Sequence, residues 1–330
     1  MKIKIGDITK IRTGKLDANA ADENGQYPFF TCSKEPLKIN TYSYDCECVL
    51  VAGNGDLNVK YYNGKFDAYQ RTYIIEDDSD GLLFMPYLYF FMESYIDELR
   101  KQSIGGVIKY IKLKNLTDAL IELPSIEVQR KIVNIISKSK EIVRRKENEF
   151  ELLDELVRAR FVEMFGEIED CDKWESKIWN EVVTIKNGRD YKKVLVSDGG
   201  YPVVGTGGEI ARASKYLCPE NTIVVGRKGS INNPMLMKEK FWNVDTAFGV
   251  IPNSDYLHYQ YFYCFCKFYN FMKLNKATTL PSTTKADLLK IRINIPPLEL
   301  QNQFASFVQE IDKSRLLNNH SLLLLKSITF

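Results

Sequence analysis

The chain has 330 residues, enough for two domains or one large one, and its 27% charged and 45% hydrophobic residues are typical of a globular protein with a sizeable core. No apolar run approaches the roughly 20 residues that span a bilayer, and the N-terminus lacks the apolar core of a signal peptide. These features exclude a membrane protein and lead us to expect a cytoplasmic one. The net charge of +2 does not by itself indicate a nucleic-acid-binding protein.

The seven cysteines favour the same compartment. An odd number without regular spacing argues against a disulfide framework and for a reducing environment. Cys46 and Cys48, and Cys264 and Cys266, form two C-x-C pairs, but there is no C-x-x-C and only two histidines are present. We therefore expect buried free thiols and no metal site.

The first part of the chain, residues 1–123, has the pattern of a mixed domain. The β-branched run 49–51 is short and ends at glycine, which predicts a strand. Asn24-Gly25 predicts a turn. The aromatic block beginning at Tyr87 continues to Arg100, and this length favours a buried helix over a strand.

Residues 124–166 predict a long amphipathic helix. Pro124 and Glu127 suit its first turn, because proline needs no hydrogen-bond partner there and a carboxylate faces the positive end of the helix dipole. We expect the helix to run from 126 to 165, a rod of roughly 60 Å. Its apolar residues recur every seven positions, which indicates a coiled-coil partner. The heptad positions are Ile136, Val143, Phe150, Val157 and Met164, and Leu153, Leu156 and Phe161 widen the stripe.

Residues 167–295 repeat the plan of the first part. Gly14 and Gly188 match at an offset of 174, as do Tyr27-Pro28 and Tyr201-Pro202. The strand predicted at 222–225 matches the one at 49–51, and the aromatic block 256–263 matches the one at Tyr87. The prolines and glutamines that begin the two long helices match at 172: Pro124 and Pro296, Gln129 and Gln301. A period this long, present twice, indicates a domain duplication and not a solenoid.

Residues 296–330 predict the second long helix. Phe304, Ile311 and Leu325 keep heptad spacing, and Asn318 interrupts the seam and could fix its register. This helix is shorter than the first, so we expect less packing surface on it. We predict an α+β protein in which two duplicated mixed α/β domains are separated by two long helices packed as an antiparallel coiled coil.

The loop 226–233 is the first candidate binding site. It follows a predicted strand, and its glycines flank two cations that can reach phosphates, while arginine can also read guanine. The alternative is a solvated hairpin turn, and the presence of a matching loop in the first copy favours DNA contact. The candidate side chains are Arg227, Lys228, Ser230, Asn232 and Asn233, with Asn54, Asn58 and Lys60 in the first copy.

A second candidate is the hydroxyl-rich stretch 276–285, whose side chains can hydrogen-bond phosphates. An ordinary polar loop is an equal alternative. The candidates are Thr279, Ser282, Thr283 and Lys285, with Lys109 and Lys112 in the corresponding stretch of the first copy. Charge favours the second copy, because residues 179–295 contain 16 Lys/Arg and 9 Asp/Glu, whereas residues 1–122 contain 15 and 18. We expect the second domain to do more of the electrostatic work.

No set of residues predicts catalysis. The glycines of 203–210 suggest a cofactor loop, but no helix pattern follows and the first copy lacks them. Asp190 with Lys192, and Glu175 with Lys177, have the acid-x-Lys spacing of some nucleases without the further acid. Two histidines leave little for general base work. We expect a chain that is not an enzyme by itself and binds no cofactor.

The two mixed domains, each ending at a Leu/Ile-Pro-x-x-Glu-x-Gln helix start, resemble the specificity subunit of Type I restriction–modification enzymes. The motifs are residues 123–133 and 295–301, the loop 226–230 is similar to that of many target recognition domains, and the resemblance covers essentially the whole chain. It implies target recognition domains at 1–123 and 167–295, and spacer helices at 124–166 and 296–330.

The resemblance also implies a role and partners. Each domain would read one half of a split target in double-stranded DNA, and the paired helices would set the gap. Two modification subunits would dock on the helices and methylate adenine with S-adenosylmethionine, and restriction subunits would add ATP- and Mg-dependent translocation and cleavage. The side chains for spacing and docking would be Ile136, Val143, Phe150, Val157, Phe304 and Ile311.

Two other functions remain open. A fused or stand-alone DNA methyltransferase or nuclease would need a cofactor loop and a catalytic set. A non-catalytic coiled-coil adaptor would not need the duplicated loop with Arg227 and Lys228, and it would show no preference among DNA sequences.

Overall fold

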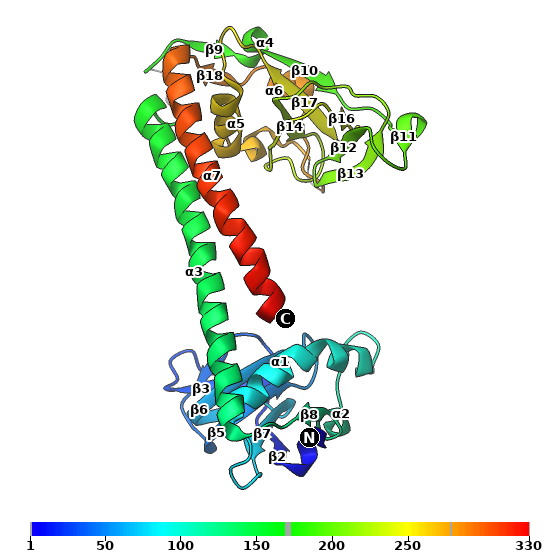
Figure 1. Ribbon diagram of the computed structural model, residues 1–330, viewed down its shortest axis with the longest axis vertical. Coiled ribbons are helices and arrows are strands. Elements are labelled where there is room, and N and C mark those ends of the chain that lie inside the picture. The colour runs from blue at the N-terminus through cyan, green and yellow to red at the C-terminus, as the bar shows by residue number, and fades with distance from the viewer. Residues whose placement is uncertain (1, 169–172, 278, 330) are drawn as a thin grey trace. The chain divides into compact units, whose positions relative to one another are not determined.

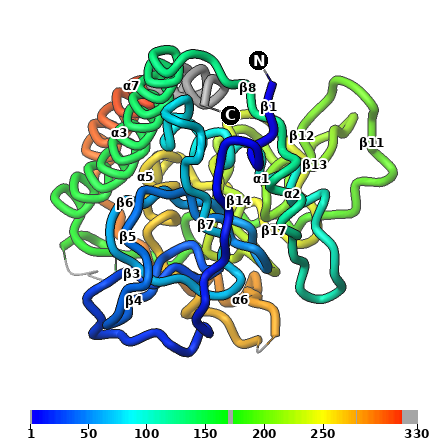
Figure 2. Tube along the Cα trace, turned by 90° about the horizontal axis from the view of Figure 1, so that it is seen from below, coloured from blue at the N-terminus to red at the C-terminus, as the bar shows by residue number. Residues whose placement is uncertain are grey.

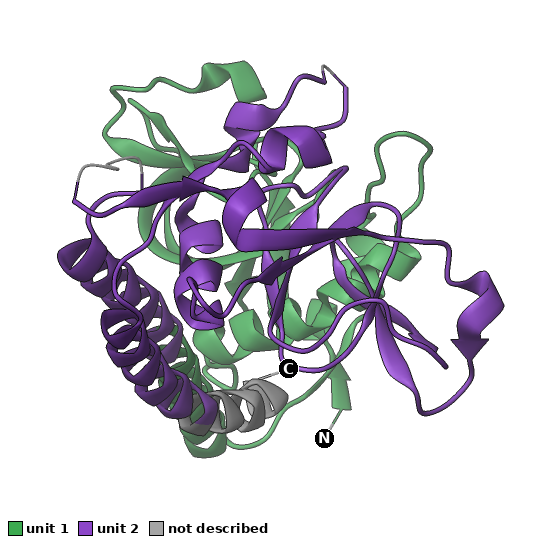
Figure 3. Cartoon of the chain, turned by 90° about the horizontal axis from the view of Figure 1, so that it is seen from above, with its two compact units in different colours: residues 1–144, 322–330 green, residues 145–321 purple. Residues whose placement is uncertain are grey.

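A computed structural model describes residues 2–168, 173–277 and 279–329, with side chains as far as residue 316. The chain divides into two compact units (Figure 3). Unit 1 comprises residues 1–144 and 322–330, and unit 2 comprises residues 145–321.

Unit 1 contains a six-stranded sheet in the order β2-β7-β5-β6-β3-β4. Neighbouring strands are antiparallel except β3 and β6, and the edge pair β3 and β4 can be followed in Figure 2. The central strand β5 is buried from Cys48 to Ala52. β-Branched residues such as Val49 and Val51 favour a strand whose faces are covered, and the strand predicted at 49–51 is confirmed. The bounds are β2 Thr9–Thr13, β3 Tyr27–Phe30, β4 Leu37–Ile39, β5 Tyr44–Ala52, β6 Val59–Ala68 and β7 Thr72–Asp77.

The aromatic block of unit 1 forms the helix α1, Met85–Gln102, as predicted. Leu88, Met92 and Leu99 recur at helical spacing and form a fully buried face that packs in one core with Val49 and Val51 of β5. A two-stranded sheet completes the unit. The remaining elements are β1 Lys2–Lys4, η1 Ile5–Asp7, η2 Ala18–Ala20, α2 Leu113–Thr117 and β8 Leu120–Glu122.

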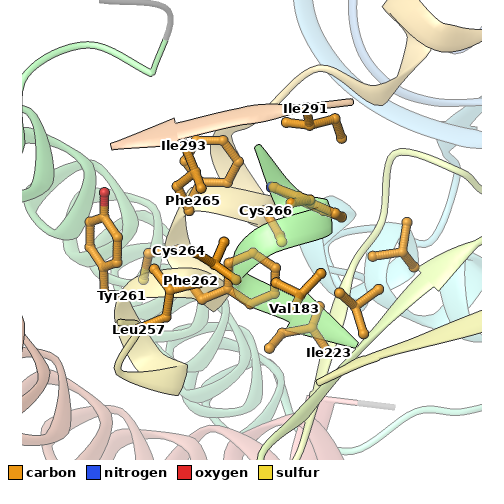
Figure 4. Packing of buried hydrophobic residues seen from close by; sticks show 14 of the residues in the cluster. Val183, Ile223, Leu257, Tyr261, Phe262, Cys264, Phe265, Cys266, Ile291 and Ile293 are labelled. Atoms are coloured by element: carbon orange, nitrogen blue, oxygen red, sulfur yellow. The ribbon is translucent and has the colours of Figure 1, made fainter. Parts of the chain in front are cut away.

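Unit 2 contains two four-stranded sheets, β10-β17-β14-β15 and β11-β13-β12-β16, and a two-stranded sheet of β9 and β18. Figure 4 shows Val183, Ile223 and Ile293 gathered around Phe262 and Phe265 of α5 in its core. The strands are β9 Ser176–Ile178, β10 Val183–Asn187, β11 Leu195–Val196, β12 Tyr201–Gly205, β13 Gly208–Ala213, β14 Thr222–Gly226, β15 Met235–Met237, β16 Trp242–Asn243, β17 Ala247–Pro252 and β18 Arg292–Asn294. The helices are α4 Trp179–Val182, η3 Lys192–Val194, α5 Tyr259–Phe268, η4 Phe271–Leu274 and α6 Lys285–Leu288.

The two units share three central strands in the same order and a matching two-stranded sheet, which confirms the duplication although the remaining strands are divided differently. The strand order β2-β7-β5 in unit 1 corresponds to β10-β17-β14 in unit 2. The small sheets agree residue by residue, because Lys2 faces Glu122 across β1 and β8, and Ser176 faces Asn294 across β9 and β18. These are the offsets of 174 and 172 that the sequence shows.

The first long helix, α3, spans Ile126–Phe165 as predicted, and the second, α7, spans Leu298–Thr329 within the predicted 296–330. Within unit 2 they run side by side and antiparallel (Figure 1), because Phe165 contacts Phe304 with ring centroids 5.4 Å apart, whereas Asp154 pairs with Arg315 at 2.8 Å. The predicted stripe is wrong at Leu156, whose side chain is 46% exposed.

Two residues of the predicted seam on α7, Asn318 and Leu325, lie outside the residues whose side chains are described.

The duplicated glutamines of the two helix starts have one structural role. Gln129 is fully buried, accepts a hydrogen bond from the backbone N–H of Phe84 at 2.8 Å and donates to the carbonyls of Leu82 and Pro124.

Gln301 has the same role in unit 2. The amide oxygen of Gln301 accepts from the N–H of His258 at 2.8 Å, and its amide nitrogen donates to the carbonyls of Tyr256 and Pro296. Each glutamine thus ties the first turn of a long helix to the start of the aromatic helix of the same unit.

Candidate nucleic-acid interface

The two stretches that the sequence singles out in unit 2 lie next to each other. Lys228 forms an antiparallel bridge with Ser282, and the N–H of Gly229 donates to the carbonyl of Pro281 at 2.9 Å. The N–H of Thr283 donates to the carbonyl of Arg227 at 3.0 Å. Two segments more than 50 residues apart therefore form one surface, which we call the unit 2 junction, residues 226–233 and 279–285.

The side chains of this junction divide into exposed and structural ones. Arg227, Lys228 and Ser230 are exposed, and the Arg227 guanidinium donates to the carbonyl of Asp245 at 3.3 Å, which holds it at the base of the loop. Asn233 and Thr279 are also exposed, and Ser282 is half-buried.

Three of the predicted contacts in unit 2 have partners within the fold. Thr283 is only 3% exposed and its hydroxyl donates to the carbonyl of Gly226 at 2.8 Å, so in this structure its side chain supports the loop. Asn232 accepts from the N–H of Phe271 at 2.8 Å, and the ammonium of Lys285 donates to the carbonyl of Ile185 at 2.9 Å. Both remain exposed at the surface.

Unit 1 brings its two stretches together in the same way. Asn54 forms a bridge with Tyr110, and the N–H of Gly55 donates to the carbonyl of Lys109 at 2.9 Å. The side chains of Lys109 and Lys112 are exposed. We call residues 53–60 with 109–112 the unit 1 junction.

Two predicted contacts of unit 1 are half-buried and engaged within the fold. The amide of Asn58 donates to the carbonyls of Cys32 and Asp56, and the ammonium of Lys60 donates to Asn58. Burial lowers the pKa of Lys60. These side chains shape the loop, and the exposed charge lies elsewhere.

The charge at the unit 1 junction is more favourable to an anion than the acidic balance of its sequence indicates. The carboxylate of Asp56, the acidic residue of the loop, pairs with Lys34 at 3.7 Å and Arg100 at 3.3 Å. Arg100 also pairs with Asp97 at 2.8 Å, so two cations face two carboxylates here. The side chains of Lys34, Asp56 and Arg100 are largely solvated, so these pairs contribute little stability, but they offset part of the repulsion that Asp56 would exert on a phosphate.

The sequence interpretation missed a cleft beside the unit 1 junction. It has a volume of about 250 Å³ and is open to solvent. It is lined by Thr13, Gly53, Gln70, Arg71, Tyr73 and Ile111. Comparison of the two copies does not indicate Arg71, because the residue at the corresponding place in the second copy, Thr246, is not a cation.

The glycine run of unit 2 forms a hairpin. Gly205 faces Gly208 across β12 and β13, and Gly208 has a φ of 113°, which favours glycine. The acid-x-Lys pairs are also structural, because Glu175 and Lys177 form an exposed ion pair of 2.7 Å. Asp190 accepts from the backbone N–H of Lys192.

Among the described residues, the cysteines are free thiols and the residue types that bind metals form no metal site. Six cysteines there are free, and burial raises the pKa of Cys264 to about 12, so this thiol stays protonated at neutral pH. Across the same residues, no group of three His, Cys, Asp or Glu side chains could hold a metal ion. No helix in the described part of the chain is long and apolar enough to cross a membrane.

Three of the six side chains assigned to spacing and docking lie in or against the core of unit 2. Val157 and Phe304 are buried in the core of unit 2, and Ile136, Val143, Phe150 and Ile311 are half-buried. The long helix α3 nevertheless exposes other apolar side chains, several of them at intervals of seven. This exposed stripe consists of Val128, Ile135, Ile142, Leu152 and Leu156.

Comparison with known proteins gives consistent matches. A family described as the Type I restriction modification DNA specificity domain matches residues 1–152 and 171–326. The EcoDI specificity subunit of Escherichia coli is 45% identical over 123 residues, which are 37% of this chain and 27% of that subunit. The MjaVIII specificity subunit of Methanocaldococcus jannaschii is 22% identical and the match covers 94% of this chain and 85% of that one.

Solved structures show the same fold. The S subunit of the Type I restriction–modification system from M. genitalium has a TM-score of 0.70 at 16% identity, covering all of this chain and 93% of that one. A structure that addresses complex assembly and conformational transition of the Type I system has a TM-score of 0.51 at 15% identity, covering all of this chain and 95% of that one.

Proposed function

The chain belongs to the Type I restriction modification DNA specificity family, and we propose that it selects the DNA sequence on which a Type I restriction–modification complex acts. As a specificity subunit it is not an enzyme by itself. The observation that carries the proposal is the duplicated junction, where each unit joins two distant loops into one surface with exposed polar side chains.

We assign one half of a bipartite target to each domain, residues 1–123 and residues 167–295. A small module contacts few base pairs, and each wrong pair costs roughly 1–3 kcal/mol, so one domain alone discriminates weakly. Because the helices 124–166 and 296–330 connect the two domains, binding of the second half-site is intramolecular once the first is bound. The discrimination by the two domains is then combined in one binding affinity. In this proposal the helices set the length of the unread gap.

The exposed stripe on α3 is the proposed docking surface for two modification subunits. Most of its apolar side chains recur at the spacing of a helix-to-helix seam, and each is more than 40% exposed. S-adenosylmethionine would be bound by those subunits, and ATP and Mg by restriction subunits. We place the complex in the cytoplasm, as the free thiols favour.

The test is a map of adenine methylation in cells that contain this chain with its modification subunit, repeated after deletion of this chain. We expect a split motif that disappears on deletion and returns with the intact gene. A methylation pattern that does not depend on the chain would contradict the proposal. Methylation by the purified chain alone would show that it is an enzyme.

A further inference from the structure

Each junction has one arginine in it or facing it: Arg227 lies within the unit 2 junction, and Arg71 lies on the turn that faces the unit 1 junction. In unit 1 the N–H of Gly53 donates to the carbonyl of Arg71 at 2.8 Å. In unit 2 the N–H of Arg227 donates to the carbonyl of Thr246, also at 2.8 Å. Gly53 and Arg227 are therefore structural equivalents, as are Arg71 and Thr246. Where unit 2 has its cation on the loop, unit 1 has it on the facing turn.

The turn that presents Arg71 is held by its backbone. The N–H of Gln70 donates to the carbonyl of Leu16 at 2.9 Å, and the N–H of Thr72 donates to the carbonyl of Tyr69 at 2.8 Å. The carbonyl of Arg71 accepts from Gly53 and also from the thiol of Cys32, at 3.6 Å. A fixed turn loses little conformational entropy on binding, which favours recognition.

The side chains on this turn are available to a ligand. Gln70 and Arg71 are both exposed, and neither side chain forms a hydrogen bond or ion pair within the described ranges of the chain. They line the cleft of about 250 Å³ together with Thr13 and Tyr73. Arginine presents a planar fork of donors that matches the O6 and N7 acceptors of guanine in the major groove, and glutamine matches adenine.

We propose that Arg71 reads a guanine in the half-site bound by unit 1, with Gln70 facing the neighbouring base pair. This inference rests on the proposed function and deepens it by naming a specificity-determining residue. Arg71 takes the part in unit 1 that Arg227 takes in unit 2. The carboxylate of Asp56 beside the same loop does not oppose this role strongly, because Lys34 and Arg100 both pair with it, although Arg100 is shared with Asp97.

The experiment is a binding cycle between residue and base. The complex of this chain with its modification subunit is titrated with a duplex carrying the mapped motif, and with duplexes in which each guanine of one half-site is replaced by 7-deazaguanine, which lacks the N7 acceptor. For the Arg71→Ala variant we expect a loss of affinity of roughly tenfold, the size typical of one lost bidentate contact to a base. One deaza substitution should weaken the wild-type complex and leave the variant unaffected.

Matched variants separate the possible outcomes. Arg71→Lys keeps the charge and should still lose the discrimination, whereas Lys38→Ala, an exposed cation of β4, should bind like the wild type. Arg227→Ala should affect only the other half-site. Equal weakening of motif and unrelated DNA would make Arg71 a phosphate contact and overturn the proposal, as would unchanged affinity or a half-site without guanine. Selective binding by the wild-type complex supports the proposed function in each of these cases.

Discussion

Gln301 illustrates how a single buried side chain can fix a helix to a domain. Its amide pairs with the N–H of His258 and the carbonyls of Tyr256 and Pro296, beside the starts of α5 and α7. Replacement by methionine keeps the volume and leaves these groups unpaired, so we expect Gln301→Met to destabilise unit 2 by about 2–3 kcal/mol. Faster hydrogen exchange of the His258 amide would report the loss directly. Gln303→Met, on the exposed face of the same turn, is the control and should change neither measurement.

His258 connects the same region to pH. It caps α5, because its Nδ1 accepts from the N–H of Gln260 at 3.1 Å, and burial lowers its pKa. A histidine whose folded pKa is lowered contributes stability that is complete above the unfolded value of about 6.5 and is lost as pH falls through the folded pKa. We expect wild-type stability to fall more between pH 8 and pH 5 than that of His258→Asn, which keeps a capping oxygen and does not titrate. Urea unfolding of both chains at each pH measures the difference, and parallel curves would contradict it.

The candidate site shows which residues a sequence can reveal. The exposed cations Arg227 and Lys228 were predictable, because glycines on both sides of them indicate a loop that approaches a ligand closely. Thr283 was not, since only the tertiary bond from its hydroxyl to Gly226 makes it structural. Arg71 was hidden because the pairing of Gly53 with its turn is a contact between residues 18 positions apart.

At the scale of elements, the long helices were the most predictable part. Heptad spacing and the proline starts give α3 its bounds of Ile126–Phe165. The stripe was less certain, because several apolar residues lie beside the seam and only packing decides which of them is covered. Leu153 is half-buried whereas Leu156 is exposed, although both are leucines on the same helix.

One carboxylate connects three helices of unit 2 that also share an aromatic core. Asp154 of α3 pairs with Lys267 of α5 at 2.7 Å and with Arg315 of α7 at 2.8 Å. Burial alone would raise the pKa of Asp154, but the hydrogen bonds from Lys267 and Arg315 outweigh it and lower the pKa. The stabilisation is therefore present above the unfolded pKa of about 3.9 and is lost as pH falls through the lower folded value.

We expect Asp154→Asn to cost about 0.5–1 kcal/mol at pH 7, a modest value because the side chains are partly solvated, and less at high salt. Urea unfolding at pH 7 and pH 3 tests both the size and the sign, since the two chains should converge at the lower pH. Glu155→Gln removes the neighbouring exposed carboxylate and should have little effect. An equal difference at both values of pH would show that the carboxylate charge is not the cause.

At the scale of the whole molecule, two faces of α3 have different tasks in the proposed assembly. Phe150 is half-buried on the heptad seam, whereas Ile142 and Leu156 are 43% and 46% exposed. A charge on the seam should therefore affect folding, and a charge on the exposed stripe should affect only what binds there. Replacement of apolar side chains by aspartate at both faces separates these effects with the same chemical change.

For Phe150→Asp we expect a loss of stability of about 2–3 kcal/mol, because a carboxylate must be accommodated at a packed position. For Ile142→Asp with Leu156→Asp we expect stability within about 0.5 kcal/mol of wild type for each change, with at least tenfold weaker binding of the modification subunit. Thermal unfolding of the chain and sedimentation of the mixed subunits give the two quantities. Full-strength assembly of the stripe variant would place the docking surface elsewhere, because a new charge at the centre of an apolar contact has to be desolvated when the subunits join.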